Sequence, residues 1–384
     1  MNDRIHVVLL APKTTRLFLP DADADVFGGA EVQLYLLSRA LVERNMQVSC
    51  IVRRPTDRLA ENLPETINRV NIVWSDPAPR LRSIPGIRLF DAWRAVWHDL
   101  DRSAERLPNH RRILLQRCGG MLTVQSGWYC RVRRIPFVFQ LASTMDSNGT
   151  VEGMLGPIYG AMYRAAVRQA NLLVAQTTQQ QSQIQERFGR DAALIRSVQE
   201  IPEREEKPRS GILWVGRSDR IKRPDLALDL AAALPEVPFA IVCPPAENTS
   251  AGAYETLRQR AKQLSNVKWI EGLSFHEADR LYATADLLIN TSDQEGYPNT
   301  FIQAARVATP IGSFRVDPDE LLLQHGAGFC AHGDWNTFVD SCRNLLENRT
   351  QWQNMSECAY RMARELHDAK AIAQEYERQF KQLI

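Results

Sequence analysis

The stretch Ile212-Leu-Trp-Val-Gly-Arg-Ser-Asp-Arg-Ile-Lys-Arg-Pro-Asp225 joins a short apolar run to the start of an amphipathic pattern. The apolar run, residues 211–215, predicts a buried strand, and the pattern over residues 225–234 predicts a helix. Pro224 fits the first position of that helix, where a backbone N–H is not needed. A strand followed directly by a helix is the repeating unit of a parallel sheet with helices on both faces, so this stretch predicts an α/β fold.

The same alternation extends along the chain in both directions. After the quoted stretch, the pattern predicts strands at residues 239–243, 267–270 and 286–290 and a helix at 253–264. Before it, the pattern predicts a β-α-β unit with strands at residues 5–11 and 47–52 and a helix at 30–44, followed by strands at 136–141 and 171–175. The sequence therefore predicts two Rossmann-like, doubly wound domains.

A domain boundary is predicted by the polar segment Gln199-Glu-Ile-Pro-Glu-Arg-Glu-Glu-Lys-Pro-Arg-Ser210, which combines two prolines with a run of charges. A chain of 384 residues also fits two domains of roughly 100–200 residues. We expect domains at residues 1–203 and 204–365 that face each other across a ligand-binding cleft, and a C-terminal segment at 366–384. The helix predicted there has one apolar stripe, formed by Ile372, Tyr376, Phe380 and Leu383.

The composition excludes several classes of protein. A net charge of +2 argues against a dedicated nucleic-acid binder. No apolar run reaches the roughly 18 residues of a membrane-spanning helix, and the first residues do not form a secretory signal, so we expect a cytoplasmic protein. The seven cysteines are scattered and contain no C-x-x-C pair. They predict reduced structural thiols rather than a disulfide framework or a zinc site.

Positive charge is concentrated in one part of the chain. Between Arg80 and Arg134 there are twelve arginines, no lysine and four acidic residues. Within this part, residues 87–100 place apolar side chains, including Trp93 and Trp97, on one helical face. Two interpretations stay open. The helix packs on the first sheet, or the Arg/Trp-rich segment 87–134 binds an anionic membrane surface that carries a lipid-linked acceptor, on the inner face of the cell membrane.

The first candidate ligand loop contains Gly28 and Gly29, which follow a predicted strand and open a predicted helix. Paired glycines let a backbone approach a ligand closely, and a helix N-terminus attracts phosphate. A turn that needs a positive φ explains the pair equally well. The preceding aspartates at 21, 23 and 25 resemble a metal-binding D-x-D motif, but they lack neighbouring ligand residues, so we expect a solvated loop and no metal site.

The second candidate loop follows the strand at residues 211–215. Gly216 and Arg217 leave the strand at its carboxyl end, and Lys222 comes just before the helix. Two cations in such a loop can clamp a diphosphate, arginine with a forked geometry and lysine as a point charge. A surface charge cluster is the alternative.

The third candidate loop lies within residues 292–312, where Glu295 stands in a Gly/Pro turn and Gln303 follows eight positions later. Asn299 suits the N-cap of a helix expected over residues 300–307. The amides of residues 296–301 would then point into the cleft, where an anionic ligand complements the helix dipole. A capped turn with an exposed glutamate is the alternative.

Together these loops resemble the retaining glycosyltransferases of family 4, which have the two-domain GT-B architecture. The matching pieces are Gly28-Gly-Ala-Glu31, Val215-Gly-Arg217 with Lys222-Arg-Pro224, and Ala285-Asp-Leu-Leu-Ile-Asn-Thr-Ser292 leading into Glu295-Gly-Tyr-Pro-Asn299. Val316-Asp-Pro-Asp319 and residues 326–334 also fit the second half of that family. The resemblance covers nearly the whole chain and is weakest in residues 55–130.

The resemblance implies a role for each matching residue. Arg217 and Lys222 would hold the diphosphate of a nucleotide-sugar donor, and Glu295 would bind a hydroxyl of its sugar; these three residues would carry catalysis. Gln303 would contact the ribose, and the last helix would cross back onto the N-terminal domain. No metal or cofactor is implied, because fixed cations can stabilise the leaving diphosphate. The remaining donor contacts would be Gly28, Gly29, Gly216, Gly296, Tyr297, Pro298, Asn299, Thr300 and Phe301.

This chain departs from the family pattern at two places. Gln303 replaces the second glutamate of the E-x7-E motif, a variant similar to a bacterial exopolysaccharide or capsule branch. Where many members have a histidine after the strand at residues 136–141, this chain has Ala142. We expect Ser143, Thr144 or Asp146 to contact the acceptor or the sugar instead, with an ordinary loop acid as the alternative for Asp146.

The sequence thus predicts a metal-independent, retaining hexosyltransferase that moves a sugar from a nucleoside-diphosphate sugar to a glycan or glycolipid acceptor in bacterial polysaccharide synthesis. One alternative is a nucleotide-sugar epimerase or hydrolase of the same fold. The other is a catalytically silent sugar-nucleotide-binding protein. Gln303 and Ala142 favour this alternative, and the presence of Arg217, Lys222 and Glu295 argues against it.

Overall fold

The computed structural model describes residues 4–19, 28–56, 62–76, 85–104, 111–246, 249–273 and 275–384, with the backbone alone at 85–92, 104, 275 and 276. The aspartates at 21, 23 and 25 lie outside these residues. The chain forms two compact units. Unit 1 holds the described residues up to Val198 together with Ala369–Ile384, and unit 2 holds Gln199–Asp368. The chain passes from unit 1 to unit 2 at the first residue of the predicted linker.

Unit 1 is built on a sheet of eight described strands in the order β3-β4-β2-β1-β5-β6-β7-β8. The pairings are parallel except that β3 runs antiparallel to β4. The strands are β1 (His6–Leu10), β2 (Gln47–Arg53), β3 (Thr66–Ile67), β4 (Val70–Ser75), β5 (Arg112–Arg117), β6 (Phe137–Gln140), β7 (Leu172–Ala175) and β8 (Ala193–Leu194).

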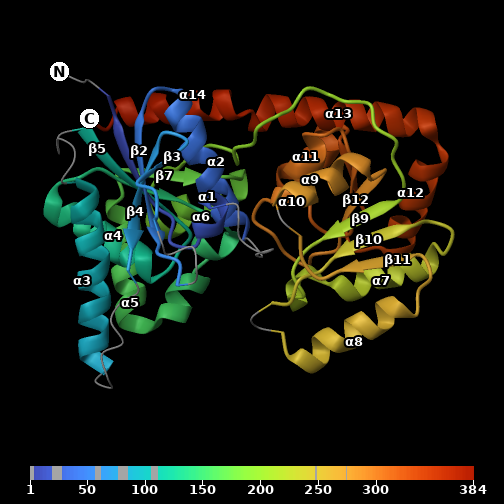
Figure 1. Ribbon diagram of the computed structural model, residues 1–384, viewed down its shortest axis with the longest axis horizontal. Coiled ribbons are helices and arrows are strands. Elements are labelled where there is room, and N and C mark those ends of the chain that lie inside the picture. The colour runs from blue at the N-terminus through green and yellow to red at the C-terminus, as the bar shows by residue number, and fades with distance from the viewer. Residues whose placement is uncertain are drawn as a thin grey trace. The chain divides into compact units, whose positions relative to one another are not determined.

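Helices cover both faces of this sheet, as right-handed crossovers between parallel strands require. Figure 1 shows the C-terminal helix α14 beside α2, far from it in sequence, and these two helices pack together. Three residues of the predicted apolar stripe, Ile372, Tyr376 and Phe380, are buried in α14 together with Ala373, whereas Leu383 follows the helix and is half-buried. The helices of unit 1 are α1 (Thr15–Phe18), α2 (Gly29–Glu43), α3 (Pro85–Ala104), α4 (Met121–Arg133), the 3-10 turn η3 (Thr144–Asp146), α5 (Thr150–Gln169), α6 (Thr178–Phe188) and α14 (Ala369–Lys381).

Unit 2 has a fully parallel sheet in the order β11-β10-β9-β12-β13-β14. Its strands are β9 (Ile212–Val215), β10 (Phe239–Val242), β11 (Val267–Ile270), β12 (Leu287–Asn290), β13 (Ile311–Ser313) and β14 (Gly328–Cys330). Its helices are η4 (Arg220–Lys222), α7 (Pro224–Ala233), α8 (Ala251–Lys262), α9 (Phe275–Thr284), α10 (Asn299–Ala305), η5 (Pro318–Glu320), α11 (Leu321–His325), α12 (Trp335–Glu347) and α13 (Arg349–His367). Two separate buried clusters form the core, one including Leu228 and Phe338, the other Phe301 and Met362.

Both sheets reverse their strand order near the middle. In unit 2 the chain runs outward from β9 through β10 to β11, and then returns to build β12, β13 and β14 on the other side of β9. In unit 1 the corresponding neighbours are β1 and β5. Ligands of open α/β sheets bind outside the carboxyl ends of the strands at such a switch point. The loops after β9 and β12 and the loops after β1 and β5 are therefore the candidate ligand loops.

The predicted α/β class is confirmed, and the predicted strands and helices lie within two residues of the observed ends, except that α14 ends at Lys381, three residues before the predicted end. One prediction of a helix start is wrong. Asn299 is the first residue of α10, and Pro298, in extended conformation at φ −67° and ψ 117°, takes the N-cap position without a side-chain hydrogen bond. The buried side chain of Tyr297 and the fixed φ of Pro298 orient the chain, so the helix begins without a polar cap.

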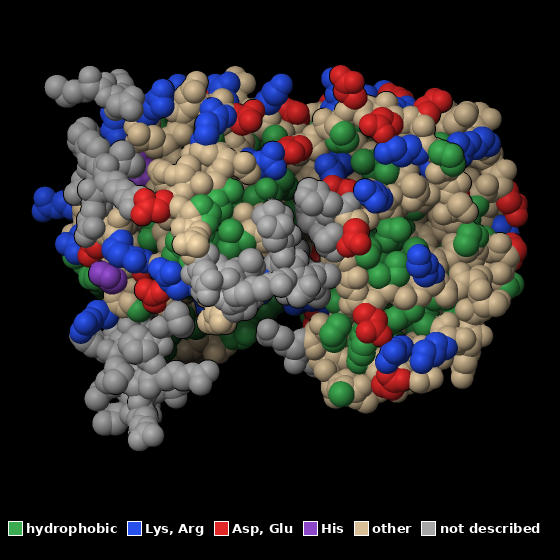
Figure 2. Space-filling view, in the orientation of Figure 1, with side chains coloured by type: hydrophobic (Ala, Val, Ile, Leu, Met, Phe, Trp, Pro, Cys, Tyr) green, Lys and Arg blue, Asp and Glu red, His purple; other side chains and the backbone are tan. Residues whose placement is uncertain are grey.

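The Arg/Trp-rich helix α3 packs on unit 1 over its described side chains. Trp93, Val96 and Trp97 contact the buried cluster of unit 1, and the indole Nε1 of Trp97 donates to the carbonyl oxygen of Gln125 at 3.3 Å. For these residues the structure shows the packed interpretation. None of the described helices is long and apolar enough to span a membrane. In unit 2, Figure 2 shows acidic and basic side chains interspersed over the visible face.

Candidate functional site

The switch point of unit 2 brings together two residues that are 73 positions apart in sequence. Lys222 Nζ lies 2.5 Å from Glu295 Oε1, and the Oγ of Ser292 donates a hydrogen bond of 2.8 Å to the same carboxylate oxygen. Lys222 follows β9, and Ser292 and Glu295 follow β12. The side chains of Lys222 and Glu295 are 29% and 13% exposed, so the pair is accessible but mostly shielded from water. A cation and a carboxylate thus stand together where the topology predicts a ligand.

Thr291 fixes the backbone that carries Lys222. The indole Nε1 of Trp214 donates to Thr291 Oγ1 at 2.8 Å, and this hydroxyl faces the carbonyl oxygens of Lys222 at 2.9 Å and Arg223 at 2.8 Å. Trp214 and Thr291 are both buried. The hydroxyl has one proton, so it donates to one carbonyl at a time. Thr291 therefore joins β9, the loop after it and the end of β12.

A second connection ties the same two loops through Asp293. Its amide donates to the carbonyl oxygen of Ile221 at 2.8 Å, and its carboxylate lies 3.5 Å from Arg223 Nη1. Arg223 has a left-handed backbone at φ 51° and forms a closer ion pair with Asp225 at 2.8 Å. Hydrogen bonding to Asp225 raises the pKa of Arg223. The loop therefore holds its cations in place before any ligand arrives.

Arg217, the other predicted diphosphate clamp, lies apart from the Lys222–Glu295 contact. Its side chain is half exposed and forms an ion pair with Asp219 at 2.9 Å. The preceding Gly216 packs against the indole of Trp214, because a Cβ at position 216 would lie 2.9 Å from the ring. The backbone at Gly216 thus passes too close to Trp214 for a larger residue. Arg217 is partly exposed and paired with an acid of its own loop.

The segment after Glu295 presents its backbone rather than its large side chains. Tyr297 and Phe301 are buried in the core, and Pro298 is buried as well. Gly296 and Thr300 are half-buried. Of the predicted donor contacts here, the two aromatic side chains thus belong to the core, because they pack beneath the loop that carries them. Asn299 Oδ1 is buried without a hydrogen-bond partner in the structure, so it can accept a hydrogen bond from a ligand or from water.

Gln303 contacts a neighbouring helix. The hydroxyl of Tyr282 in α9 donates to Gln303 Oε1 at 3.0 Å. Tyr282 is buried, and this burial raises the pKa of its hydroxyl. An amide oxygen has two lone pairs, and the Tyr282 hydroxyl uses one of those of Gln303.

In unit 1, the predicted phosphate loop begins at Gly28, the N-cap of α2. The carboxylate of Glu31, in the first turn, folds back over this glycine, since a Cβ at position 28 would clash with Glu31 Oε2. Gly29 is the first residue of the helix. The positive end of α2 is therefore already approached by a carboxylate, and an anionic ligand would compete with it.

Asp146 organises the loops after β5 and β6. Its buried carboxylate accepts hydrogen bonds from the amides of Gly119 at 2.9 Å, Ala142 at 2.6 Å and Ser143 at 3.1 Å. Burial raises its pKa, and these three amide donors oppose the shift. Ser143 Oγ accepts from the amide of Met145 at 3.2 Å, and Thr144 is buried. Asp146 and Ser143 thus hold the backbone of these two loops through hydrogen bonds, and Thr144, which lies between them in sequence, is buried.

The sequence reasoning missed Arg117, which ends β5 at the switch point of unit 1. The side chain is 5% exposed, its Nη2 donates to Gln176 Oε1 at 3.1 Å, and its Nε and Nη1 have no hydrogen-bond partner. Burial lowers its pKa. Unpaired buried donors of this kind indicate ordered water or an anionic group. The available signal was Gly119-Gly120, which follows a strand and opens α4 as the Gly28–Gly29 pair opens α2.

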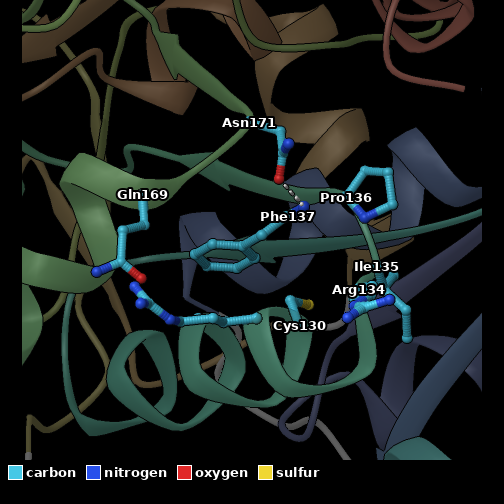
Figure 3. Close-up of a pocket in the computed structure, with 9 residues that line it drawn as sticks. Cys130, Arg134, Ile135, Pro136, Phe137, Gln169 and Asn171 are labelled. Atoms are coloured by element: carbon cyan, nitrogen blue, oxygen red, sulfur yellow. Dashed lines mark hydrogen bonds between the residues drawn. The ribbon is translucent and has the colours of Figure 1, made fainter.

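One described pocket lies away from both switch points. It has a volume of about 420 Å³ and lies at the amino end of β6, between the ends of α4 and α5. Figure 3 shows Asn171 accepting from the amide of Phe137 above Cys130, with Arg134 at one side. Ligands of parallel sheets bind at the carboxyl ends of strands, so this pocket lies at the opposite edge of the sheet from the candidate ligand loops. In the described part of the chain no three His, Cys, Asp or Glu side chains are grouped to hold a metal ion.

Two family models match the chain, and each follows one unit. The model described as "Glycosyltransferase Family 4" matches residues 27–199. The model described as "Glycosyl transferases group 1" matches residues 209–348. The Lys222–Glu295 contact lies inside the second match.

Solved structures resemble the chain over nearly its whole length. Sucrose-phosphate synthase from Thermosynechococcus elongatus is 18% identical, with 99% of each chain covered and a TM-score of 0.75. Alr3699/HepE from Anabaena, in complex with UDP-glucose, is 18% identical, with 99% of this chain and 100% of that chain covered and a TM-score of 0.71. WaaG, a glycosyltransferase involved in lipopolysaccharide biosynthesis, is 14% identical, with 97% and 98% covered and a TM-score of 0.63. No curated protein matches the chain.

Proposed function

We propose that this chain, a glycosyltransferase whose two domains have the GT-B fold, transfers a hexose from a nucleoside-diphosphate sugar to a glycan or glycolipid acceptor with retention of configuration. The observation that carries the proposal is the contact of Lys222 with Glu295 at the switch point of unit 2. Both residues match the family positions for the diphosphate and the donor sugar.

The chemistry of this pair suits departure of a nucleoside diphosphate. The bond between the anomeric carbon and the diphosphate oxygen breaks, and negative charge develops on that oxygen. The acceptor hydroxyl oxygen bonds to the anomeric carbon on the same face, and its proton passes to the departing diphosphate. Lys222 stabilises the charge, and Arg217 can swing from Asp219 toward the same group. Glu295 accepts a hydrogen bond from a sugar hydroxyl and so orients the ring. Because protein cations supply the positive charge, we propose that transfer needs no metal.

The donor base and the acceptor class are proposed from what similar proteins bind. The Anabaena protein has been solved in complex with UDP and with UDP-glucose, and a mutant of the Staphylococcus aureus protein TarM in complex with Fondaparinux, α-GlcNAc-glycerol and UDP. We therefore propose a uridine-diphosphate sugar as donor, and a bacterial cell-surface or exopolysaccharide glycan as acceptor. We propose that transfer takes place in the cytoplasm or at the inner face of the membrane, where the arginines of segment 87–134 would contact anionic lipid, while Trp93 and Trp97 stay packed on unit 1. If the protein does not sediment with anionic liposomes at low salt, the proposal that it binds the membrane is wrong.

A binding panel followed by a transfer assay tests the proposal. Thermal unfolding is measured with the diphosphates of uridine, guanosine and adenosine and with their common sugars, and the best donor is then incubated with glycan acceptors in EDTA and analysed by mass spectrometry and NMR. We expect stabilisation by a uridine nucleotide and an α-linked product from an α-linked donor. Donor turnover without acceptor favours the epimerase or hydrolase alternative. Binding without any turnover favours the silent protein.

Two variants connect the activity to the site. Lys222→Met and Glu295→Gln keep the size of each side chain and remove its charge, and we expect each to lower kcat about 100-fold or more, the typical effect of losing a group that stabilises transition-state charge. Lys381→Met is a matched control, since Lys381 also pairs with a glutamate, Glu377 at 2.7 Å, but does so on α14. Near-normal transfer by either site variant would show that the motif is assigned wrongly.

A further inference from the structure

The loop that carries Glu295 is hydrogen-bonded to the end of α13. Two residues after Glu295, the hydroxyl of Tyr297 lies 3.0 Å from Nε2 of His367, and the two rings lie 5.1 Å apart between centroids. Tyr297 is 6% exposed and His367 is fully buried. His367 is the last residue of α13. The polar contact is therefore sealed inside unit 2, under the loop of the candidate site.

The same histidine is bonded to the segment where the chain enters unit 2. The amide of Gln199 donates to the carbonyl oxygen of His367 at 2.8 Å, and Gln199 forms an isolated parallel β-bridge with Asp368. Gln199 is the first described residue of unit 2, and Asp368 is the last. Both passages of the chain between the units therefore meet at His367.

A purely structural role would not require this pair of side chains. Burying a hydroxyl and an imidazole costs free energy that phenylalanine and leucine would not cost, and the hydrogen bond only offsets that cost. What the polar pair adds is direction, because a hydrogen bond fixes the orientation of both groups while apolar packing tolerates several. Here the fixed groups belong to the Glu295 loop and to the two chain passages.

We propose that His367 is a positioning residue that holds the Glu295 loop through Tyr297 and couples this loop to the passages at Gln199 and Asp368. This inference rests on the proposed function, in which Glu295 binds the donor sugar. When donor binding orders the loop, the Tyr297–His367 hydrogen bond restricts the motion of the end of α13. The hydrogen bond from the Gln199 amide to His367 then restricts the motion of the entering segment. Loss of the contact uncouples the loop from the passages and weakens donor binding.

The test uses the full chain with Tyr297→Phe, which removes the hydroxyl alone, and with His367→Leu and His367→Gln. Tyr360→Phe is the matched control, because the Tyr360 hydroxyl also joins α13 to the entering segment, at Pro202 O over 2.8 Å, without touching the loop. Two quantities are measured well below the unfolding temperature. They are the hydrogen-exchange rates of the Phe301 and Gln199 amides, which bond to Pro298 O and His367 O, and the Kd for UDP-glucose.

We expect Tyr297→Phe and His367→Leu to speed exchange of both amides by about two- to tenfold and to raise Kd by a similar factor, as loss of one buried hydrogen bond allows. His367→Gln can still form a hydrogen bond with Tyr297, so its exchange rates and its Kd should stay close to those of the wild type. Tyr360→Phe should leave the exchange of the Phe301 amide and the Kd unchanged. Faster exchange at Phe301 with an unchanged Gln199 overturns the coupling, as does no change at either. If the wild type binds no nucleotide sugar, the proposed function fails, while the two exchange rates still decide the coupling.

Discussion

Replacing Thr291 with valine removes one buried hydroxyl and almost nothing else, because the two side chains have nearly the same shape. In the wild type this hydroxyl accepts from Trp214 Nε1 and faces the carbonyl oxygens of Lys222 and Arg223. The variant leaves the indole N–H of Trp214 without its acceptor in a fully buried position. It also removes a donor from the backbone that carries Lys222.

The expected loss of stability follows from counting the groups left unpaired. A buried donor or acceptor without a partner costs roughly 1–3 kcal/mol. The variant creates one unpaired indole N–H and removes one carbonyl partner, and the Arg223 carbonyl keeps its bond from the Leu226 amide. We therefore expect Thr291→Val to lower the free energy of unfolding of unit 2 by about 3 kcal/mol. Thr291→Ser keeps the hydroxyl and loses one methyl group, so it should cost only about 1 kcal/mol.

Native-state hydrogen exchange measures this quantity in unit 2 without assuming that the whole chain unfolds in one step. The opening free energies of the most protected amides of β9 and β12 are compared among wild type, Thr291→Val and Thr291→Ser. We also expect the valine variant to transfer sugar more slowly than the serine variant, because the backbone of Lys222 is less fixed. Equal losses for both variants, or a loss below about 1 kcal/mol for valine, would refute the reasoning.

Three further predictions concern other parts of the molecule. Burial lowers the pKa of His6 from 6.5 to about 4, so the unfolded state binds a proton before the folded state does as pH falls. Between pH 6.5 and 4 the wild type should therefore lose about 3 kcal/mol of unfolding free energy that His6→Gln does not lose. Urea unfolding at several pH values checks this difference. Arg117→Met should lower thermal stability, because the variant removes a positive charge that helps to keep the buried carboxylate of Asp146 ionised; an unchanged or higher unfolding temperature would show that the cost of burying the guanidinium, two of whose nitrogens have no hydrogen-bond partner, outweighs this loss. Gln303→Glu should bind UDP about fivefold more tightly by calorimetry, because a carboxylate accepts stronger hydrogen bonds than an amide, and weaker binding would contradict a ribose contact.

The sequence alone predicted most of the fold. Strand and helix periods are local properties, so the runs around Val215 and Leu288 predict their elements correctly, and Pro224 does open α7. The loops that follow β9 and β12 could also be chosen as candidate ligand loops, because glycines and cations directly after a strand are visible in the sequence. Lys222 and Glu295 were identified in this way, and their assigned roles stay predictions.

Side-chain direction could not be predicted from those patterns. Tyr297 stands in the loop among predicted donor contacts, yet its ring is buried against His367, 70 positions away. Asp146 was predicted as a sugar or acceptor contact or as an ordinary loop acid, and its carboxylate is buried where three amides from two loops converge on it. Arg117 lies in a segment whose charge suggested a surface, yet its guanidinium is buried. The direction and burial of each of these side chains depend on residues that are distant in sequence and are brought next to it by tertiary packing.

The sequence by itself determined the elements, their order and the chemical groups available at the strand ends. Only the tertiary structure decided which of these groups meet. Lys222 and Glu295 touch because β12 returns to the far side of β9, and no local pattern states that pairing. The physical reason is that secondary structure follows from the period of neighbouring residues, whereas strand order follows from the packing free energy of the whole domain.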